Sequence, residues 1–148
     1  MTVVSSHNDW DPLEEVFVGI ADHARIPTVD KSTHSFGFAD CKYEHIKDLE
    51  GPSPQWVIDE ANEDLDTLSK FLEGEGAEVI RPQQIEKTQY YDYCPRDIGF
   101  VHNKLALATP NPIRPRATNW KNIDHAFDDP MVVLAADRND YNYNLDCC

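Results

Sequence analysis

A run of apolar residues at helical spacing constrains the fold of this chain more than any other feature. After Ser53 and Pro54, apolar side chains recur at steps of three and four residues, with acidic side chains between them. Serine is a good N-cap, proline is tolerated at the first helical position, and Gly74 and Gly76 are typical of a helix end. The segment therefore predicts one long amphipathic helix. Its apolar positions are Val57, Ile58, Ala61, Leu65, Leu68, Phe71 and Leu72.

Short apolar segments on both sides of this helix are typical of buried strands. Residues 13–20 contain a β-branched and aromatic run that follows Asp11 and Pro12, and residues 77–82 end in a proline. A helix that returns the chain to a sheet brings two such strands together as parallel neighbours. The sequence predicts a βαβ unit, and the expected fold class is α/β with a mixed sheet.

The segments outside this unit carry weaker patterns. Residues 21–52 show no sustained periodicity, so we expect a long irregular connection of the kind that often serves as a lid or binding loop. Residues 97–101 and 105–108 are two apolar runs around a short turn, in which Asn103 tolerates the left-handed conformation. These two runs predict a hairpin.

Prolines interrupt the last part of the chain, at positions 110, 112, 115 and 130. Within it, only residues 131–136 form an apolar run that predicts a strand or a short helix. We therefore expect a folded module over residues 1–109, followed by a divergent, Pro-rich and partly disordered tail over residues 110–148.

Composition excludes several classes of partner. The chain has 148 residues with 41% apolar content, which is enough for a single core. Its 27 acidic and 13 basic residues give a formal net charge of −14, which repels nucleic acids and anionic membrane surfaces. The first residues lack the pattern of a signal peptide, and no stretch approaches the roughly 20 apolar residues of a membrane span. We expect a cytoplasmic protein without nucleic-acid or membrane partners.

Neither the cysteines nor the histidines are spaced like metal ligands. The four cysteines include no C-x-x-C pair, and the adjacent Cys147 and Cys148 could bridge each other only under strain. Reduced thiols are the first interpretation, and capture of a metal or cross-linking of two chains by the terminal pair is the alternative. The six histidines are scattered, so we predict no metal site.

Four segments resemble the glycine and inosamine-phosphate amidinotransferases. Residues 7–19, His-Asn-Asp-Trp-Asp-Pro-Leu-Glu-Glu-Val-Phe-Val-Gly, are similar to the opening strand of these enzymes, and residues 24–32 resemble the loop that follows in bacterial members. Residues 74–82 resemble their passage from helix to strand, and residues 93–97 are similar to their Tyr-Cys-Pro-Arg-Asp signature. The likeness covers residues 7 to about 109 and then thins to Arg114, Arg116 and the pair Asp140-Tyr141.

The resemblance implies a part of the pentein fold, which is a propeller of ββαβ modules around a central site. It also implies transfer of an amidino group from L-arginine to an amine, either glycine or an inosamine, without a cofactor. In the family a cysteine attacks the guanidinium carbon to form an amidino-cysteine intermediate, a histidine handles protons, and carboxylates hold the planar cation.

By the same resemblance, Asp97 contacts the guanidinium of arginine, which a carboxylate can orient through two hydrogen bonds. A carboxylate at the start of an apolar strand must be paired or functional. The competing interpretation is that Asp97 pairs with Arg96 or caps a turn. Arg96 joins the expected substrate-binding set, and so do Arg114 and Arg116, which would contact a substrate carboxylate or an acid of a neighbouring module. Tyr90, Tyr91, Asp92 and Tyr93 would line the pocket or pack against the sheet.

The family's nucleophilic cysteine lies in a Gly-rich phrase of a longer chain, and its histidine comes from a later module. Neither phrase occurs in this sequence. Cys94 is interpreted as an inert buried thiol, and Cys147 and Cys148 lack the Gly-rich context. We expect an incomplete amidinotransferase, inactive alone, whose other modules are lost by truncation or lie on another polypeptide. The alternative is a non-catalytic module for arginine binding or assembly. Unpaired sheet edges predict a homo-oligomer or docking to another chain in either case.

Overall fold

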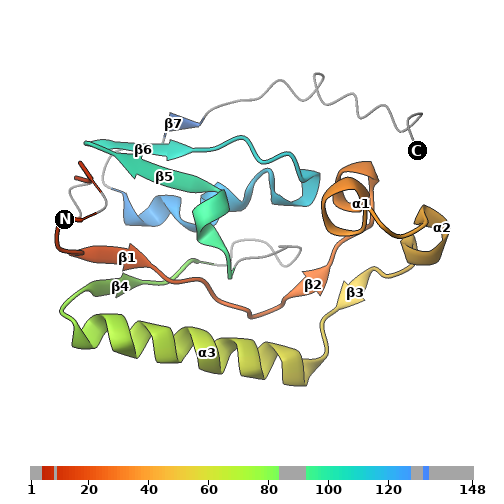
Figure 1. Cartoon of the computed structure of the whole chain (residues 1–148), viewed down its shortest axis with the longest axis horizontal. Helices are drawn as coiled ribbons and strands as arrows, with labels where there is room; N and C mark the ends of the chain where they lie inside the picture. The colour runs from red at the N-terminus through yellow and green to blue at the C-terminus, as the bar shows by residue number, and fades with distance from the viewer. Residues whose placement is uncertain (1–4, 9, 84–92, 128–131, 134–148) are drawn as a thin grey trace.

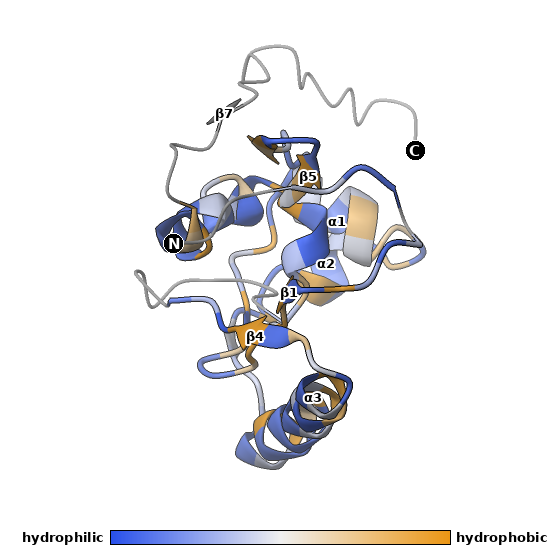
Figure 2. Ribbon diagram, turned by 90° about the vertical axis from the view of Figure 1, so that its left-hand side faces the viewer, coloured by the Kyte–Doolittle hydropathy of each residue, from blue (hydrophilic) through white to orange (hydrophobic). Residues whose placement is uncertain are grey.

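The computed structural model describes residues 5–8, 10–83, 93–127 and 132–133 of the chain (Figure 1). Over these residues the chain forms two sheets of two strands and one sheet of three strands, with helices around them. This is a mixed α/β arrangement, as the sequence predicted. In two perpendicular views the β1–β4 pair lies between the long helix α3 and the β5–β6 hairpin (Figures 1 and 2).

The predicted βαβ unit is present. Strand β1 (Glu15–Phe17) pairs in parallel with β4 (Glu78–Ile80), with Val16 opposite Val79. Helix α3 (Gln55–Gly74) joins them. The predicted N-cap at Ser53 is wrong, because Pro54 occupies the N-cap position with an extended ψ of 138° and no side chain caps the helix. Both strands are shorter than the apolar runs that predicted them.

Helix α3 packs one face on the sheet and is tied to β4 at one point. The guanidinium of Arg81 donates to Asp66 Oδ1 at 2.6 Å and to Ser69 Oγ at 2.7 Å, which fixes the helix over the strand end. Ile58 is buried, whereas Leu68 and Phe71 are 47% and 63% exposed although their spacing puts them in the predicted apolar set. A two-stranded sheet is too narrow to cover that whole set, so part of it faces outward.

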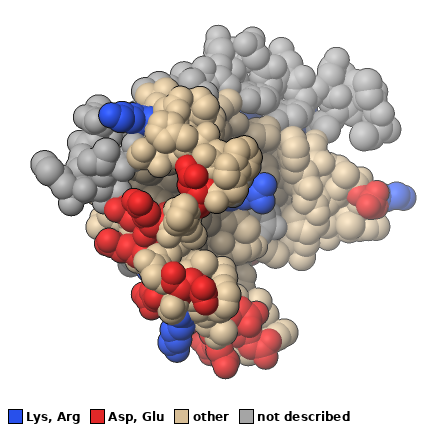
Figure 3. Space-filling view, turned by 60° about the vertical axis from the view of Figure 1, so that its left-hand side comes forward, with Lys and Arg blue, Asp and Glu red and all other residues tan. Residues whose placement is uncertain are grey.

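The exposed side of α3 is strongly acidic. In the space-filling view, acidic side chains gather over the lower part of the molecule, where α3 lies (Figure 3). Negative charge near a helix N-terminus is favourable, since it opposes the positive end of the helix dipole. The exposed acidic residues of the first three turns are Asp59, Glu60, Glu63 and Asp64.

The prediction of an irregular connection over residues 21–52 is wrong. Strand β2 (Arg25–Ile26) pairs antiparallel with β3 (Gly51–Pro52), and two short helices, α1 (Lys31–Gly37) and α2 (Tyr43–Ile46), lie between them. The carboxylate of Asp30 accepts a hydrogen bond from the backbone N–H of Thr33 at 2.9 Å and so caps α1. The cap stabilises the first turn of α1, although residues 21–52 show no apolar periodicity that would predict a helix.

The predicted hairpin is confirmed. Strand β5 (Gly99–His102) pairs antiparallel with β6 (Leu105–Ala108), and Asn103 takes the left-handed conformation in the turn, with φ 54°. Strand β7 (Val132–Val133) adds in parallel to β6. A strand is thus present at the two described residues of the predicted segment 131–136, and the other four lie outside the described residues.

Three short 3₁₀ helices follow the hairpin and complete the core. They are η2 (Arg114–Arg116), η3 (Asn119–Asn122) and η4 (Asp124–Ala126). Ile123, between η3 and η4, is 4% exposed and packs with Ile98, Ala106 and Ala108 of the hairpin region. Phe17, Trp120 and Phe127 pack against the same cluster. The boundary at residue 109 stays a prediction, because residues 134–148 lie outside the described residues.

A close backbone approach joins β1 to the segment that precedes β5. A Cβ atom built on Gly19, just after β1, would lie 2.4 Å from the backbone carbon of Tyr93, closer than real Cβ contacts. Glycine at this position therefore lets the end of β1 lie directly against the segment 93–97. The backbone of this segment, rather than a movable side chain, fills the space.

We expect Ile123→Ala to lower the free energy of unfolding by about 2–5 kcal/mol, the usual cost of a cavity in a packed core. Leu105→Ala is the matched control, since Leu105 is on β6 but 44% exposed, and it should cost clearly less. Urea denaturation followed by circular dichroism measures both values. Equal losses would contradict a core that includes Ile123.

We expect Gly19→Ala to destabilise the chain by about 1–3 kcal/mol, because the added methyl group forces the backbone at Tyr93 to move. Gly51→Ala is the control, since no atom lies within 4 Å of its Cβ position. Amide NMR shifts should change at residues 93–97 in the first variant only. Unchanged shifts there in Gly19→Ala would rule out the close approach.

Candidate functional site

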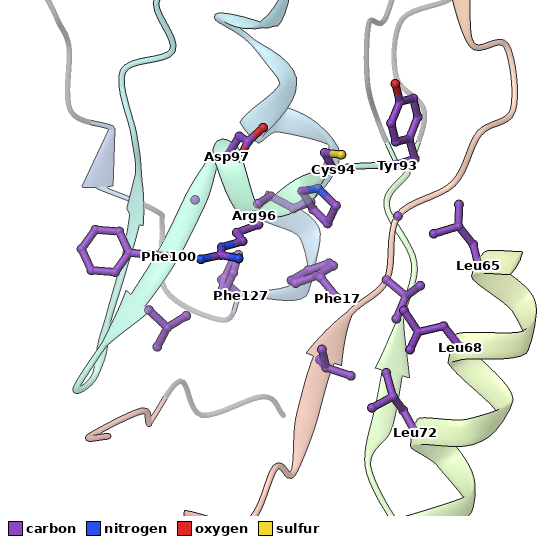
Figure 4. Close-up of a pocket in the computed structure, with 17 residues that line it drawn as sticks. Phe17, Leu65, Leu68, Leu72, Tyr93, Cys94, Arg96, Asp97, Phe100 and Phe127 are labelled. Atoms are coloured by element: carbon purple, nitrogen blue, oxygen red, sulfur yellow. The ribbon is translucent and has the colours of Figure 1, made fainter. Parts of the chain in front are cut away.

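A cleft of about 420 Å³ opens between the β1–α3 side of the molecule and the segment that leads into β5 (Figure 4). Its wall is mostly apolar. Leu65, Leu68 and Leu72 of α3 form one side, and Phe17 of β1 projects into the middle. The other side comes from residues 93–97 and from β5. A cleft of this size, with a few polar groups on an apolar wall, is typical of a site for a small molecule.

The charged side chains of the cleft lining, Arg96 and Asp97, come from one short 3₁₀ helix, η1 (Pro95–Asp97). Proline at its first position fixes the backbone angle that the turn needs, and the N–H of Ile98 closes the turn on the carbonyl of Pro95 at 3.1 Å. Thr109 Oγ1 donates to the carbonyl of Asp97 at 2.9 Å, which ties η1 to the end of β6. The turn thus holds Arg96 and Asp97 beside the cleft.

Asp97 is paired with Arg116 and not with its neighbour Arg96. Arg116 Nη1 donates to Asp97 Oδ2 at 2.7 Å, and Arg116 Nη2 donates to the carbonyl of Cys94 at 2.9 Å. The Arg116 side chain is only 3% exposed, while that of Asp97 is 55% exposed. Within the described part of the chain, the second carboxylate oxygen of Asp97 has no hydrogen-bond partner.

Arg96 lies on the other side of η1. Figure 4 shows its side chain extending into the cleft, toward the side of Phe100 and Phe127, while Asp97 leaves the turn in the opposite direction. Arg96 is exposed and has no ion pair or hydrogen bond with any of the described residues. It therefore presents a guanidinium with unused donors to an apolar cleft.

Arg114 lies apart from the cleft, against α1. Its backbone N–H donates to Ser32 Oγ at 3.1 Å, and its Nε is 3.9 Å from Asp30 Oδ2, with the side chain 69% exposed. Burial raises the pKa of Asp30, but hydrogen bonds from Ser32 and Thr33 and the charge of Arg114 outweigh it, so that this pKa lies below its usual value. Of the four predicted site residues, Arg96 and Asp97 line the cleft, Arg116 contacts Asp97 from outside the cleft wall, and Arg114 lies elsewhere.

Cys94 lines the cleft but is a poor nucleophile. Burial raises the pKa of its thiol above the usual value, the charge of Arg116 offsets this in part, and Asp97 adds to the rise. The thiol is therefore protonated at neutral pH, which disfavours attack on carbon. Cys41, the other described cysteine, is exposed.

The remaining predictions for the site fall in different places. Tyr93 lines the cleft, but Tyr90, Tyr91 and Asp92 lie outside the described residues, as do Asp140, Tyr141, Cys147 and Cys148. In the part of the chain that the structure covers, no three His, Cys, Asp or Glu side chains are grouped so that they could hold a metal ion. No described helix has the length and apolarity needed to cross a membrane.

The pairing of Asp97 with Arg116 was not foreseen from the sequence. The two residues are 19 positions apart, and no local pattern links them. The only available signal was the requirement that a carboxylate beside an apolar strand has a partner. The contribution of Leu65 and Leu72 was foreseeable, since both belong to the predicted apolar face of the helix.

Several amidinotransferases are similar to this chain. No protein-family model matches the chain. Inosamine-phosphate amidinotransferase 1 of Streptomyces glaucescens is 35% identical over 127 residues, which cover 78% of this chain and 36% of the relative. The mitochondrial glycine amidinotransferase of Danio rerio is 30% identical over 133 residues, covering 80% of this chain and 31% of the relative. An L-arginine:L-lysine amidinotransferase of Pseudomonas savastanoi pv. phaseolicola is 35% identical over 89 residues, with coverages of 60% and 24%.

A solved structure agrees with these relatives. The inosamine-phosphate amidinotransferase of Streptomyces griseus superposes with a TM-score of 0.79 and 30% identity, over 93% of this chain and 44% of the other. The chain spans about a third of the length of the curated relatives that match over most of its residues, 36% and 31% in the two cases above. The chain is thus a homologue of a part of the inosamine-phosphate and glycine amidinotransferases, as its sequence motifs predicted.

Proposed function

We propose that this chain forms the arginine-binding part of an amidinotransferase, and that Asp97 holds the guanidinium group of L-arginine. The observation that carries the proposal is the Asp97 carboxylate on a turn that lines an apolar cleft, anchored through one oxygen by a buried guanidinium. A carboxylate so anchored keeps its other oxygen for a second planar cation. Asp97 also belongs to the segment that resembles the family signature.

The cleft suits the rest of the arginine molecule. Its volume of about 420 Å³ lies within the usual range for small-molecule sites, and its leucine and phenylalanine wall fits a chain of methylene groups. One relative is named for L-arginine and L-lysine, and others are named for glycine or inosamine phosphate. We assign L-arginine as the donor and a small amine as the acceptor.

Arg96 is proposed to contact an anionic group of the substrate. Its guanidinium extends into the cleft and has no partner among the described residues (Figure 4). The α-carboxylate of arginine is an anion of the matching planar shape. Arg114 is 69% exposed and outside the cleft wall, so we assign it to a contact with a substrate carboxylate, or with an acid of a neighbouring module, only when other parts of the enzyme are present.

Transfer of the amidino group is proposed to need further parts of the enzyme. The raised pKa of Cys94 makes its thiol a poor nucleophile. This chain matches 36% of the first relative, which leaves 64% of the relative unmatched. In a complete pentein propeller, the family's cysteine and histidine would come from that unmatched portion. We therefore expect little activity from the isolated chain. We also propose a cytoplasmic location and a reaction without a cofactor.

A second candidate function is a non-catalytic module for arginine binding or assembly. The observation that favours it is the exposure of three large apolar side chains of α3, with Trp56 66%, Leu68 47% and Phe71 63% exposed. Apolar groups of this size on one helix are typical of a face that another protein surface covers. In this case the chain would form a homo-oligomer or dock to another chain while retaining the cleft.

Isotope transfer and calorimetry test whether the isolated chain is active and whether it binds arginine. The purified chain is incubated with arginine labelled at its guanidino carbon, with glycine or hydroxylamine as acceptor. Label in the acceptor would support an active enzyme. Saturable arginine binding in calorimetry without transfer would support the arginine site and is expected under both candidates. A chain that neither binds nor transfers would refute the proposed arginine site.

We expect Asp97→Asn to weaken arginine binding about tenfold or more, because a charge-assisted hydrogen bond to the guanidinium is lost. Asp40→Asn is the matched control, since Asp40 is exposed and outside the wall of the cleft, and it should leave the affinity unchanged. Calorimetric titration measures both. Equal affinity in Asp97→Asn and the wild-type chain would remove Asp97 from the site.

We expect Arg96→Met to weaken binding of arginine but not of agmatine, which has the same guanidinium but lacks the carboxylate. The reason is that the Arg96 guanidinium is assigned to the carboxylate alone. Titration of one variant with the two ligands provides its own control. A parallel loss for both ligands would assign Arg96 to another role.

A further inference from the structure

The contacts of Arg116 give it a different role from that of a substrate contact. Its side chain is 3% exposed and is absent from the cleft wall, so a bound ligand in the cleft would not touch it. Two of its side-chain hydrogen bonds go to the segment that carries the site: one to the Asp97 carboxylate and one to the carbonyl of Cys94. We propose that Arg116 is a positioning residue, which fixes the Asp97 carboxylate for a ligand guanidinium. This inference rests on the proposed arginine site.

The two hydrogen bonds span the short turn η1 from one end to the other. Cys94 precedes the turn and Asp97 ends it, so the planar fork of one guanidinium clamps both ends. The arginine is itself held by its own short helix, η2, in which the N–H of Arg116 donates to the carbonyl of Ile113 at 2.9 Å. The clamp therefore connects the cleft to the packed interior rather than to a mobile surface group.

Charge explains why the carboxylate stays in place. Arg116 is a buried cation, and leaving a buried charge uncompensated is very unfavourable, so Asp97 is held through Oδ2. Because this oxygen is engaged, Oδ1 is the oxygen that a ligand can reach. The orientation of the carboxylate is thus set before any ligand binds, which lowers the entropy cost of binding.

Three roles of Arg116 predict three different responses to Arg116→Met. If it positions Asp97, affinity falls for arginine and for agmatine alike, by about tenfold or more for a lost charge-assisted contact. If it binds the carboxylate of arginine directly, only arginine is affected. If it merely lies near the site, removal of a positive charge strengthens the binding of both cationic ligands, because their repulsion by Arg116 is relieved.

The experiment titrates the wild-type chain, Arg116→Met and Arg116→Lys with agmatine and with arginine, and records near-ultraviolet circular dichroism to verify the fold. We expect Arg116→Lys to recover part of the affinity for both ligands, because an ammonium keeps the charge but cannot span both acceptors. Arg81→Met is the structural control. It removes a guanidinium that holds α3 to β4 through Asp66 and Ser69, and it should lower stability without changing affinity.

The outcomes separate the two proposals. If the wild-type chain binds neither ligand, the proposed function fails, and the role of Arg116 fails with it. If the wild-type chain binds agmatine and Arg116→Met binds it equally well or more tightly, only the positioning role is overturned. An equal loss of agmatine affinity in Arg81→Met would also overturn it, because the effect would then reflect stability alone.

Discussion

The ion pair between Asp97 and Arg116 is the interaction on which the arrangement of the cleft depends. Its cation is buried and its anion is half exposed, so the pair connects the interior of the molecule to the cleft. A pair of this kind adds little net stability, because removing two charges from water costs about as much as their attraction returns. Its effect is on geometry. One guanidinium sets the position of η1, and η1 carries the charged side chains of the cleft lining.

The surrounding fold holds this turn from two further sides. Gly19 brings the end of β1 against the backbone of Tyr93, and the hydroxyl of Thr109 holds the carbonyl of Asp97 from the end of β6. The βαβ unit and the hairpin therefore meet at the segment 93–97, which links two layers of the fold. This explains why a chain with small sheets keeps a defined cleft: its apolar wall comes from both layers, and its polar groups come from the junction between them.

Sequence reasoning succeeded where the signals are local. The period of α3 and the tolerance of Asn103 for a positive φ are properties of a few adjacent residues, and both elements are present. It failed for residues 21–52, where short helices lack a measurable period and Asp30 supplies only a single cap. The partner of Asp97 could not be predicted either, because Arg116 lies 19 residues away and their meeting depends on the whole core around Ile123. Family likeness identified Asp97 as a candidate, and the structure adds its ion pair with Arg116.

The charge of the chain acts on the same cleft at longer range. The Asp97–Arg116 pair is neutral as a unit, and Arg96 adds a positive charge, so the residues of the cleft alone do not attract a cation. The chain as a whole carries a formal net charge of −14, and α3 supplies both a wall of the cleft and a row of exposed acids. A field of this sign raises the local concentration of cationic ligands and repels anionic ones, although salt screens it beyond about 8 Å. Under the proposed function, attraction of a guanidinium ligand and its orientation are separate tasks: the acidic surface of α3 would serve the first, and the anchored carboxylate of Asp97 would serve the second.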